Sequence, residues 1–289
     1  MALWFVALLG VVQGLTEFIP VSSSAHLRLA AAFTGQADAG TAYTAVLQLG
    51  TLIAVLVYFA KDLLQLTTAA VTKPTSREAR LVWLLGVASI PLAVAGLALK
   101  SYITEDLRRL EVVGSALLGV GFLLILVDRR GGRERTLTMI GWSDALLIGL
   151  AQAAAVMPGV SRSGATICMA LMLGMTRTDA ARFSFLLSIP AVAGAGIFEV
   201  KDAVDHMEQL GANPLLSLAI GTVVSGVVGY ASIAWFLRWL GTRRMHIFGV
   251  YRMAVGALVL LGLWLGWLRN ERHQEPPRAD PHAKNHSPS

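Results

Sequence analysis

Residues 143–175 read SDALLIGLAQAAAVMPGVSRSGATICMALMLGM, and this stretch decides the fold. It is apolar enough for a membrane helix, but its middle holds a proline, glycines and an arginine between two serines. Each half is too short to cross a bilayer, whose apolar core of about 30 Å needs roughly 20 residues. Polar backbone at that depth is tolerated only inside protein or beside water. The stretch therefore predicts a re-entrant helical hairpin, which enters and leaves the membrane on one side.

A second stretch, residues 1–33, has the same character. It reads MALWFVALLGVVQGLTEFIPVSSSAHLRLAAAF and is interrupted by Gln13, Glu17, Pro20 and three serines. The letters GLTE precede this break as GLAQ precedes the other, and each break continues into a proline and a serine cluster. We therefore expect a second hairpin. Broken helices in matching positions of two halves indicate an internal repeat with a site near the membrane midplane.

Six other apolar stretches are long enough, or nearly so, to cross the membrane. They are Thr41–Ala60, Leu81–Leu99, Val112–Val127, Phe183–Val200, Leu215–Leu237 and Phe248–Leu268. Three follow each hairpin, so the units 1–128 and 143–268 have opposite orientations. We expect an all-α polytopic integral membrane protein with six transmembrane helices, two re-entrant hairpins and an inverted repeat, forming a single integral membrane domain over residues 1–268.

The composition excludes several classes of protein. Of 289 residues, 55% are hydrophobic and 15% charged, against about 25% charged in soluble domains. Cys168 is the sole cysteine, which excludes a disulfide scaffold, and we expect it to be a small packing residue. The first basic residue is Arg28, so we expect no cleavable signal peptide. Residues 269–289 are polar, and we expect a disordered tail rather than a metal site despite its three histidines.

The net charge of +6 is better explained by lipid than by nucleic acid, because Lys and Arg next to apolar spans set orientation and contact anionic headgroups. If the loop 61–80 faces the cytoplasm, thirteen basic residues lie on that side and four on the other. The thirteen are Lys61, Lys73, Arg77, Arg80, Arg129, Arg130, Arg133, Arg135, Arg177, Arg182, Arg238, Arg243 and Arg244, and the four are Lys100, Arg108, Arg109 and Lys201. This bias predicts that the first hairpin opens to the outer face of the membrane and the second to the cytoplasmic face.

The first break carries residues suited to catalysis. Gln13 and Glu17 are four apart, so they share one helix face. A carboxylate inside an apolar segment is costly and is kept mostly with a partner or a task. His26 follows Ser23 by three residues, which favours a serine nucleophile with a neighbouring base. The structural alternative is that Glu17 and the serines only cap the helix ends.

The second break, Pro158–Thr166, carries residues suited to an anion. Gly159 and Gly164 permit tight turns, and Arg162 presents a guanidinium that matches phosphate in two-point contact. Glycines, hydroxyls and an arginine at a helix start indicate a phosphate cradle. An internal ion pair between Arg162 and Glu17 is the structural alternative.

Together the two motifs resemble those of the undecaprenyl-pyrophosphate phosphatase family, the bacitracin-resistance phosphatases of bacteria. That family has (E/Q)xxxE, matched from Gln13 to Glu17, and PGxSRSxxT, matched without a break from Pro158 to Thr166. The likeness extends over nearly the whole chain, including the segment QLGT that begins at Gln48. It implies an enzyme that hydrolyses undecaprenyl diphosphate to the monophosphate and inorganic phosphate. This reaction regenerates the lipid carrier for peptidoglycan and other cell-wall glycans and gives bacitracin resistance. Together with the charge bias, the resemblance implies a multi-pass protein of the bacterial cytoplasmic (inner) membrane, with the active site opening to the outer, periplasmic face.

The resemblance also assigns residues. It implies that Glu17, Ser23, His26 and Arg162 are catalytic. The expected substrate-binding residues are Gln13, Ser22, Ser24, Gln48, Ser161, Ser163, Gly164 and Thr166. Many members have glutamate at position 13, so this chain lacks one carboxylate there. By resemblance a divalent cation, Mg²⁺ or Ca²⁺, takes part, and we expect it to be held mainly by the diphosphate.

Several alternatives stay open at this point. Ser23 could attack the terminal phosphorus or position a water that does, with His26 taking the proton. The expected partners are a prenyl diphosphate and membrane lipids and not nucleic acid, and the sequence leaves a homodimer open. The rival class is a transporter or flippase of a lipid phosphate, because inverted repeats with broken helices are also a transporter architecture.

Overall fold

The computed structural model describes residues 1–36, 40–98, 107, 109–130, 133–205 and 213–268, without the side chains of 41–42 and 197–205. The predicted tail, 269–289, lies outside the described residues. The α-helices are α1 (Leu3–Thr16), α2 (Ser23–Thr34), α3 (Gly40–Tyr58), α4 (Ala60–Thr72), α5 (Arg77–Ala98), α6 (Leu110–Arg129), α7 (Trp142–Ala153), α8 (Arg162–Met172), α9 (Arg177–Asp205), α10 (Pro214–Leu240) and α11 (His246–Trp264). Two 3₁₀ turns, η2 (Leu137–Met139) and η3 (Ala154–Val156), flank α7. The described residues form no strand, so the predicted all-α class is confirmed.

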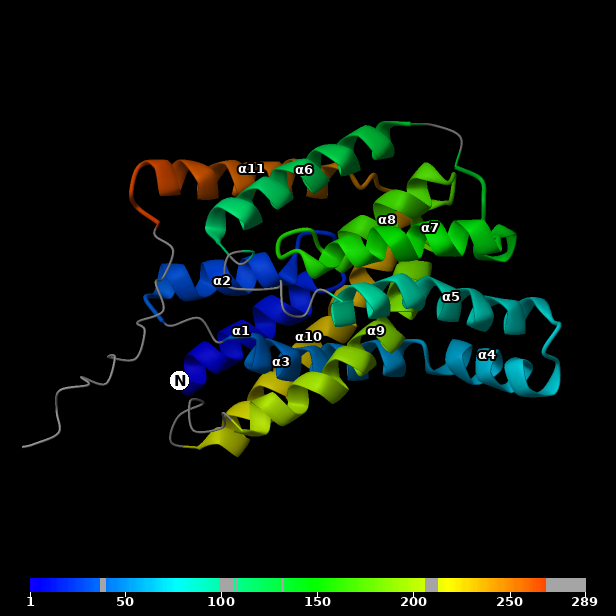
Figure 1. The fold of residues 1–289 in the computed structure, drawn as a ribbon, viewed down its shortest axis with the longest axis horizontal. Helices are drawn as coiled ribbons and strands as arrows, with labels where there is room; N and C mark the ends of the chain where they lie inside the picture. The colour runs from blue at the N-terminus through cyan, green and yellow to red at the C-terminus, as the bar shows by residue number, and fades with distance from the viewer. Residues whose placement is uncertain (37–39, 99–106, 108, 131–132, 206–212, 269–289) are drawn as a thin grey trace, which may run out of the picture.

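Both predicted breaks are present as turns between two short helices. The first separates α1 from α2, and the second separates α7 and η3 from α8. The helix pair α1–α2 opens toward the end of the molecule that holds the N-terminus, and α7–α8 opens toward the opposite end (Figure 1). Their turns meet near the middle of the molecule (Figure 1). At the open end of the first pair, Gly35 takes a left-handed backbone, φ +66°, and ends α2.

Four helices are long and apolar enough to cross a membrane, namely α5, α6, α10 and α11. A fifth crossing is available if α3 and α4, which bend by 75° at their junction, count as one broken span. These five correspond to five of the six predicted stretches, although α11 ends at Trp264, four residues before the predicted end. The predicted span Phe183–Val200 lies within α9, which does not meet the same test over its described residues. Several apolar helices thus identify a multi-pass membrane protein.

Small residues let the long helices approach closely. The helices α6 and α11 cross where Gly121 faces Gly249, since a Cβ added at either would lie within 2.8 Å of the other's carbonyl oxygen. The helices α3 and α10 cross at Gly50, where an added Cβ would lie 2.1 Å from Ser225 Oγ. Close backbone approach of this kind is how helices associate in lipid, where no hydrophobic effect drives them together.

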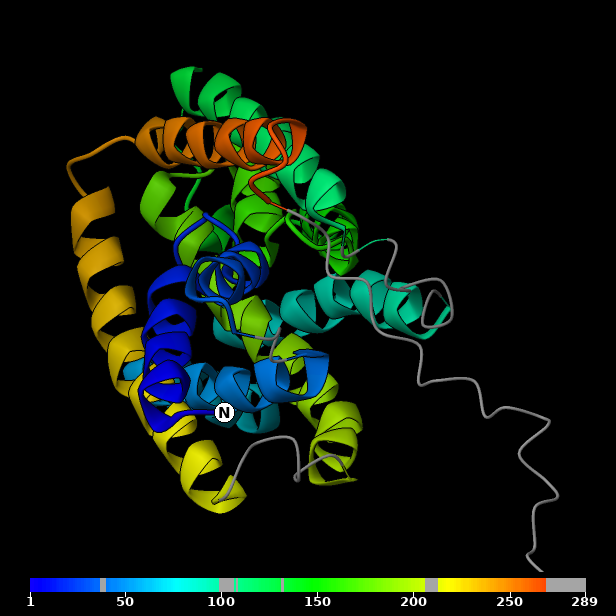
Figure 2. The same cartoon turned by 90° about the vertical axis from the view of Figure 1, so that its left-hand side faces the viewer.

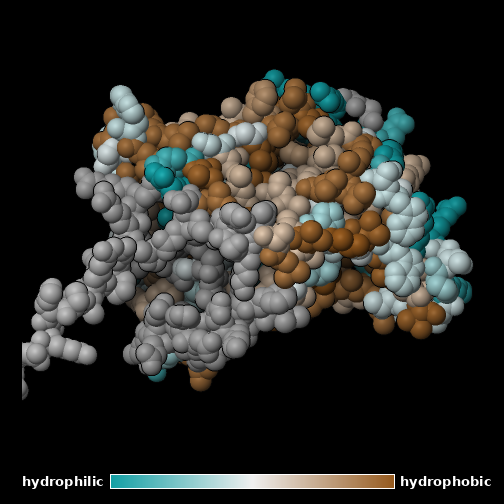
Figure 3. Space-filling model, viewed as in Figure 1, coloured by the Kyte–Doolittle hydropathy of each residue, from teal (hydrophilic) through white to brown (hydrophobic). Residues whose placement is uncertain are grey.

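The two short helix pairs lie between these layers. Figure 2 shows α2 and α8 in the middle of the molecule, with α6 and α11 above, α3 and α9 below and α10 along one side. The helix α1 packs against α10, and α7 packs in the same way against α5. On the face in Figure 3, apolar residues cover the middle and hydrophilic residues gather chiefly at the right-hand end.

A buried carboxylate ties three helices together at that polar end. Asp128, at the end of α6, accepts from Arg177 Nε at 2.6 Å and from the backbone N–H of His246 at 2.9 Å. Arg133 lies 3.6 Å from the same carboxylate. The side chain of Asp128 is fully buried, and its partners compensate the cost of burying its charge. Asp128 therefore fixes the starts of α9 and α11 relative to α6.

Candidate functional site

The first turn presents Glu17 with two neighbours from its own helix pair. Glu17 lies directly after α1, is 8% exposed, and accepts from Gln13 Nε2 at 2.8 Å through Oε2. The predicted shared face of Gln13 and Glu17 is thereby confirmed. The Ser23 hydroxyl, at the start of α2, donates to the same oxygen at 2.8 Å. One carboxylate thus holds an amide and a hydroxyl in a fixed arrangement.

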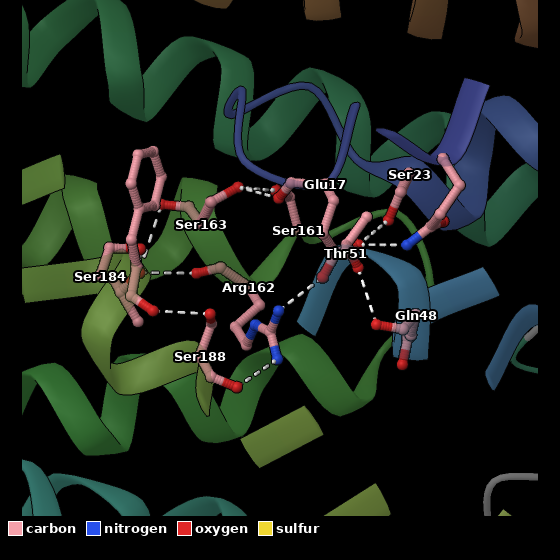
Figure 4. A network of polar contacts seen from close by, with 12 residues as sticks. Glu17, Ser23, Gln48, Thr51, Ser161, Arg162, Ser163, Ser184 and Ser188 are labelled. Carbon is pink, nitrogen blue, oxygen red and sulfur yellow. Dashed lines mark hydrogen bonds and ion pairs between the residues drawn. The ribbon is translucent and has the colours of Figure 1, made fainter. Parts of the chain in front are cut away.

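The second turn brings Arg162 to this carboxylate. Arg162 is the first residue of α8, and its Nη2 donates to Glu17 Oε1 at 2.5 Å, across 145 residues of sequence. Both side chains are largely buried, with 17% of Arg162 and 6% of Glu17 exposed. Arg162 Nη1 also donates to the carbonyl of Ser188 in α9, at 3.4 Å. Figure 4 shows the resulting network, in which groups from both turns and from α9 converge.

Hydroxyls of the second turn fasten it to the first. The hydroxyl of Ser163 donates to the carbonyls of Glu17 at 3.1 Å and Ile19 at 3.3 Å. The Ser161 hydroxyl lies 3.2 Å from that of Ser163, and it accepts from the N–H of Gly164 as the N-terminal cap of α8. The two turns are therefore joined by hydrogen bonds from the Ser163 side chain to the backbone of the first turn, as well as by the ion pair.

The turns share an unusual backbone feature. Ser22 and Ser161 have φ of +77° and +70°, and they are the non-glycine residues with positive φ among those that the structure describes. Each immediately precedes the second helix of its pair. Such a conformation is disfavoured for residues other than glycine and clusters at functional sites. The two positions correspond in the repeat that the sequence suggests.

His26 does not contact Ser23 as the sequence suggested. Its Nδ1 lies 2.7 Å from the carbonyl oxygen of Ser22, and its Nε2 lies 2.8 Å from the hydroxyl of Tyr251 in α11. The Ser23 hydroxyl instead donates to Glu17. The group next to the Ser23 hydroxyl is therefore a carboxylate, and the imidazole lies on the α11 side of α2.

The remaining predicted residues lie around this network. Thr166 bonds to the carbonyl of Arg162 at 2.8 Å and to the hydroxyl of Ser184 at 2.7 Å. The Ser22 and Ser24 hydroxyls lie 3.3 Å apart. The close-up in Figure 4 places Gln48 of α3 in the same neighbourhood, and its carbonyl accepts from Thr51.

Arg252 is a buried residue that sequence reasoning missed. Its side chain is fully buried in α11, and it donates to the carbonyls of Pro20 at 3.2 Å, Gly159 at 2.7 Å and Val160 at 3.0 Å. It therefore holds both turns at once. The signal was available, because an arginine inside an apolar span needs partners. Thr51, Ser184, Ser188 and Tyr251 were missed as well.

The described residues do not form a protein-built divalent cation site. They contain no group of three or more His, Cys, Asp and Glu side chains that could hold a metal ion. Glu17 already binds Gln13, Ser23 and Arg162. Mg²⁺ requires six oxygen ligands in near-octahedral geometry. The residues present could contribute at most part of such a shell.

These features define a multi-pass helical membrane protein with an acid–arginine site where two helical turns meet. The chain belongs to the bacitracin resistance protein family, since residues 6–258 match the family described as Bacitracin resistance protein BacA. It is 48% identical over 259 residues to an undecaprenyl-diphosphatase of a Nocardioides species, covering 88% of this chain and 93% of that protein. It is 46% identical over 275 residues to one of Myxococcus xanthus, covering 93% and 91%. It is 49% identical over 263 residues to one of Gloeobacter violaceus, covering 88% and 89%.

Proposed function

We propose that this protein hydrolyses undecaprenyl diphosphate to undecaprenyl phosphate and inorganic phosphate, and so regenerates the lipid carrier for cell-wall glycans. Family membership and relatives named undecaprenyl-diphosphatase support the proposal. The observation that carries it is the contact between Glu17 and Arg162. It gathers an acid, the Ser23 hydroxyl and a guanidinium at one place among apolar helices, where charged groups are costly unless they have a task.

We further infer that the chain is an inverted repeat with two re-entrant hairpins, α1–α2 and α7–α8, and six crossings, of which α9 is the sixth. The opposite openings of the hairpins support this inference. So do the positive φ of Ser22 and Ser161 and the matching contacts of α1 with α10 and α7 with α5. In this arrangement the prenyl chain stays among hydrocarbon tails while the diphosphate reaches the turns.

Arg162 is the proposed phosphate ligand. Its guanidinium can contact two phosphoryl oxygens at once, and the N-terminus of α8 adds favourable partial charge. An incoming diphosphate competes with Glu17 for this guanidinium. Binding would therefore free the Glu17 carboxylate from its ion pair at the moment when a base is needed, and Arg162 would stabilise charge on the transferred phosphoryl group.

In the proposed reaction Ser23 Oγ attacks the terminal phosphorus. A bond forms between Oγ and phosphorus while the bond from phosphorus to the bridging oxygen breaks, and undecaprenyl phosphate leaves with that oxygen. The Ser23 proton passes to Glu17, which already accepts its hydrogen bond at 2.8 Å. Water then attacks the phosphoserine, His26 takes the water's proton, and Glu17 returns its proton to Ser23 as phosphate leaves. In the alternative route, Ser23 positions a water that attacks directly. A phosphate trapped on Ser23 separates the two routes.

A divalent cation is part of the proposal only through the substrate. With one carboxylate at the turns, the cation would be held mainly by diphosphate oxygens, and it would neutralise their charge. No step of the proposed reaction depends on this cation. Mg²⁺ and Ca²⁺ titrations with phosphate release as the readout test the expectation.

The proposed location is the bacterial inner membrane, with the site opening to the periplasmic face through α1–α2. The bias of basic residues toward the other end supports this orientation. Raised bacitracin tolerance on overexpression is the cellular result expected. A homodimer stays a prediction, which the mass of the purified complex would test.

The decisive assay is phosphate release from C55 and C15 prenyl diphosphates by protein purified in detergent. Wild type should release phosphate, while Glu17→Ala, Ser23→Ala and Arg162→Ala should lose most of it. Arg80→Ala, which replaces an exposed arginine in the first turn of α5, is the matched control and should retain full activity. Lipid translocation in vesicles without phosphate release would instead support the alternative, a transporter of a lipid phosphate.

A further inference from the structure

Tyr251 of α11 makes two contacts with His26 of α2. Its hydroxyl lies 2.8 Å from His26 Nε2, and the two rings are stacked, with centroids 5.6 Å apart and planes inclined by 12°. The residues are 225 positions apart in sequence. Neither the composition nor the motifs at the two turns pointed to this tyrosine.

The contacts of the imidazole fix its tautomer. A carbonyl oxygen only accepts, so the 2.7 Å contact with the Ser22 carbonyl requires a proton on His26 Nδ1. In the neutral ring Nε2 is then the basic nitrogen, and the Tyr251 hydroxyl donates to it. If Nε2 gains a proton, the same hydroxyl oxygen can accept from it. The pair can therefore host either protonation state of His26 without moving the ring.

The placement of Tyr251 is tied to the turns themselves. The next residue, Arg252, is fully buried and donates to carbonyls of both turns. The backbone of α11 at Tyr251 is thereby held at a fixed distance from the start of α2. Tyr251 is 45% exposed, so burial alone does not account for its position against His26.

We propose that Tyr251 is a positioning residue of the site, which holds the orientation of the His26 imidazole, so that Nε2 stays the nitrogen that accepts a proton while the Ser22 carbonyl fixes the Nδ1–H tautomer. The inference rests on the proposed phosphatase function for its kinetic consequence. The hydrogen bond made by one ring nitrogen of a histidine sets which of the two nitrogens is reactive. Tyr251 need not touch the substrate.

The kinetic test is Tyr251→Phe, which keeps the ring and removes the hydroxyl. We expect the kcat for phosphate release from undecaprenyl diphosphate to fall about five- to tenfold, the worth of one hydrogen bond, with KM within twofold. In a His26→Ala background the same change should cost nothing more. Tyr230→Phe is the matched control, since Tyr230 is also 45% exposed, stacks edge-on with Tyr58, and makes no hydroxyl hydrogen bond among the described residues. Unchanged kcat in Tyr251→Phe, or an equal loss in both backgrounds, would overturn the proposal.

A spectroscopic test does not depend on activity. With ¹⁵N-labelled histidine, His26→Gln identifies the His26 signals among those of the six histidines in the chain. We expect the Nδ1–H tautomer in wild type, in Tyr230→Phe and in Tyr251→Phe, because all three keep the Ser22 carbonyl. The Nε2 resonance should shift in Tyr251→Phe alone, because that nitrogen loses its hydrogen bond from the hydroxyl. An Nε2–H tautomer in wild type, or no change in Tyr251→Phe, contradicts the inference. If wild type releases no phosphate, the proposed function fails, and these spectra still decide the role of Tyr251.

Discussion

The ion pair between Glu17 and Arg162 can be tested through protein stability, independently of any reaction. The perturbations are Glu17→Gln, Arg162→Gln and the double substitution. With 6% and 17% of their side chains exposed, both charges are mostly removed from water. Breaking a buried pair by removing one partner costs about 3–5 kcal/mol. Because glutamine keeps some hydrogen bonds at each position, we expect each single change to lower the free energy of unfolding by about 3 kcal/mol.

The double substitution gives the diagnostic result. If the charges interact, the second change removes a partner that is already lost, and the total falls about 2 kcal/mol short of the sum of the single effects. The assay is thermal unfolding in detergent, in which 1 kcal/mol corresponds to about 2–4 °C for a domain of this size class. Additive single effects would mean that the charges do not interact, and the convergence of the two turns would then be refuted.

Further predictions concern Arg162 as the phosphate ligand, Arg252 as the residue that holds both turns, and the close helix crossings. Arg162→Lys loses two-point contact and should lower phosphate release about 100-fold, measured on C55 diphosphate. Arg252→Met leaves the carbonyls of Pro20, Gly159 and Val160 without a donor, and it should lower the free energy of unfolding by about 4 kcal/mol and speed hydrogen exchange at both turns. Gly50→Ala places a Cβ 2.2 Å from the Thr222 carbonyl oxygen and should cost more than about 2 kcal/mol, whereas Gly86→Ala meets nothing within 4 Å and should be neutral or slightly stabilising in the same unfolding assay.

Much of the fold could be predicted because its causes are local. Apolar stretches of membrane-spanning length and their polar interruptions are visible in the sequence, and the breaks occur as turns before Ser23 and Arg162. The predicted span Thr41–Ala60 ends near the bend between α3 and α4, which no proline marks. The early charges of α9, Arg177 and Asp179, start that helix well before the apolar stretch, because they bond at the polar end of the bundle.

The sequence pointed to the charged residues of the two turns, but not to the contacts that other side chains make around them. Glu17 and Arg162 stand out because charges are rare within apolar segments, and their contact was one of two readings. The contact of His26 with Tyr251 depends on how α11 packs against α2, and residue spacing within one segment carries no information about that. The spacing along α2 suggested that His26 contacts Ser23. The Ser23 hydroxyl instead donates to Glu17, which directly follows α1. Arg252 lies near the start of its span, where an arginine is usually taken to reach the membrane surface.

The central claim is that the two turns meet inside the protein. Its most direct measurement is cross-linking of Glu17→Cys with Arg162→Cys in a Cys168→Ala background, using a short thiol-specific linker and mass spectrometry. The control pairs Arg162→Cys with Ser76→Cys, in the turn between α4 and α5 at the polar end (Figure 1). We predict a linked peptide that joins residues 17 and 162 in high yield and little linkage in the control. Equal yields from the two pairs, with every cysteine reactive on its own, would contradict the account.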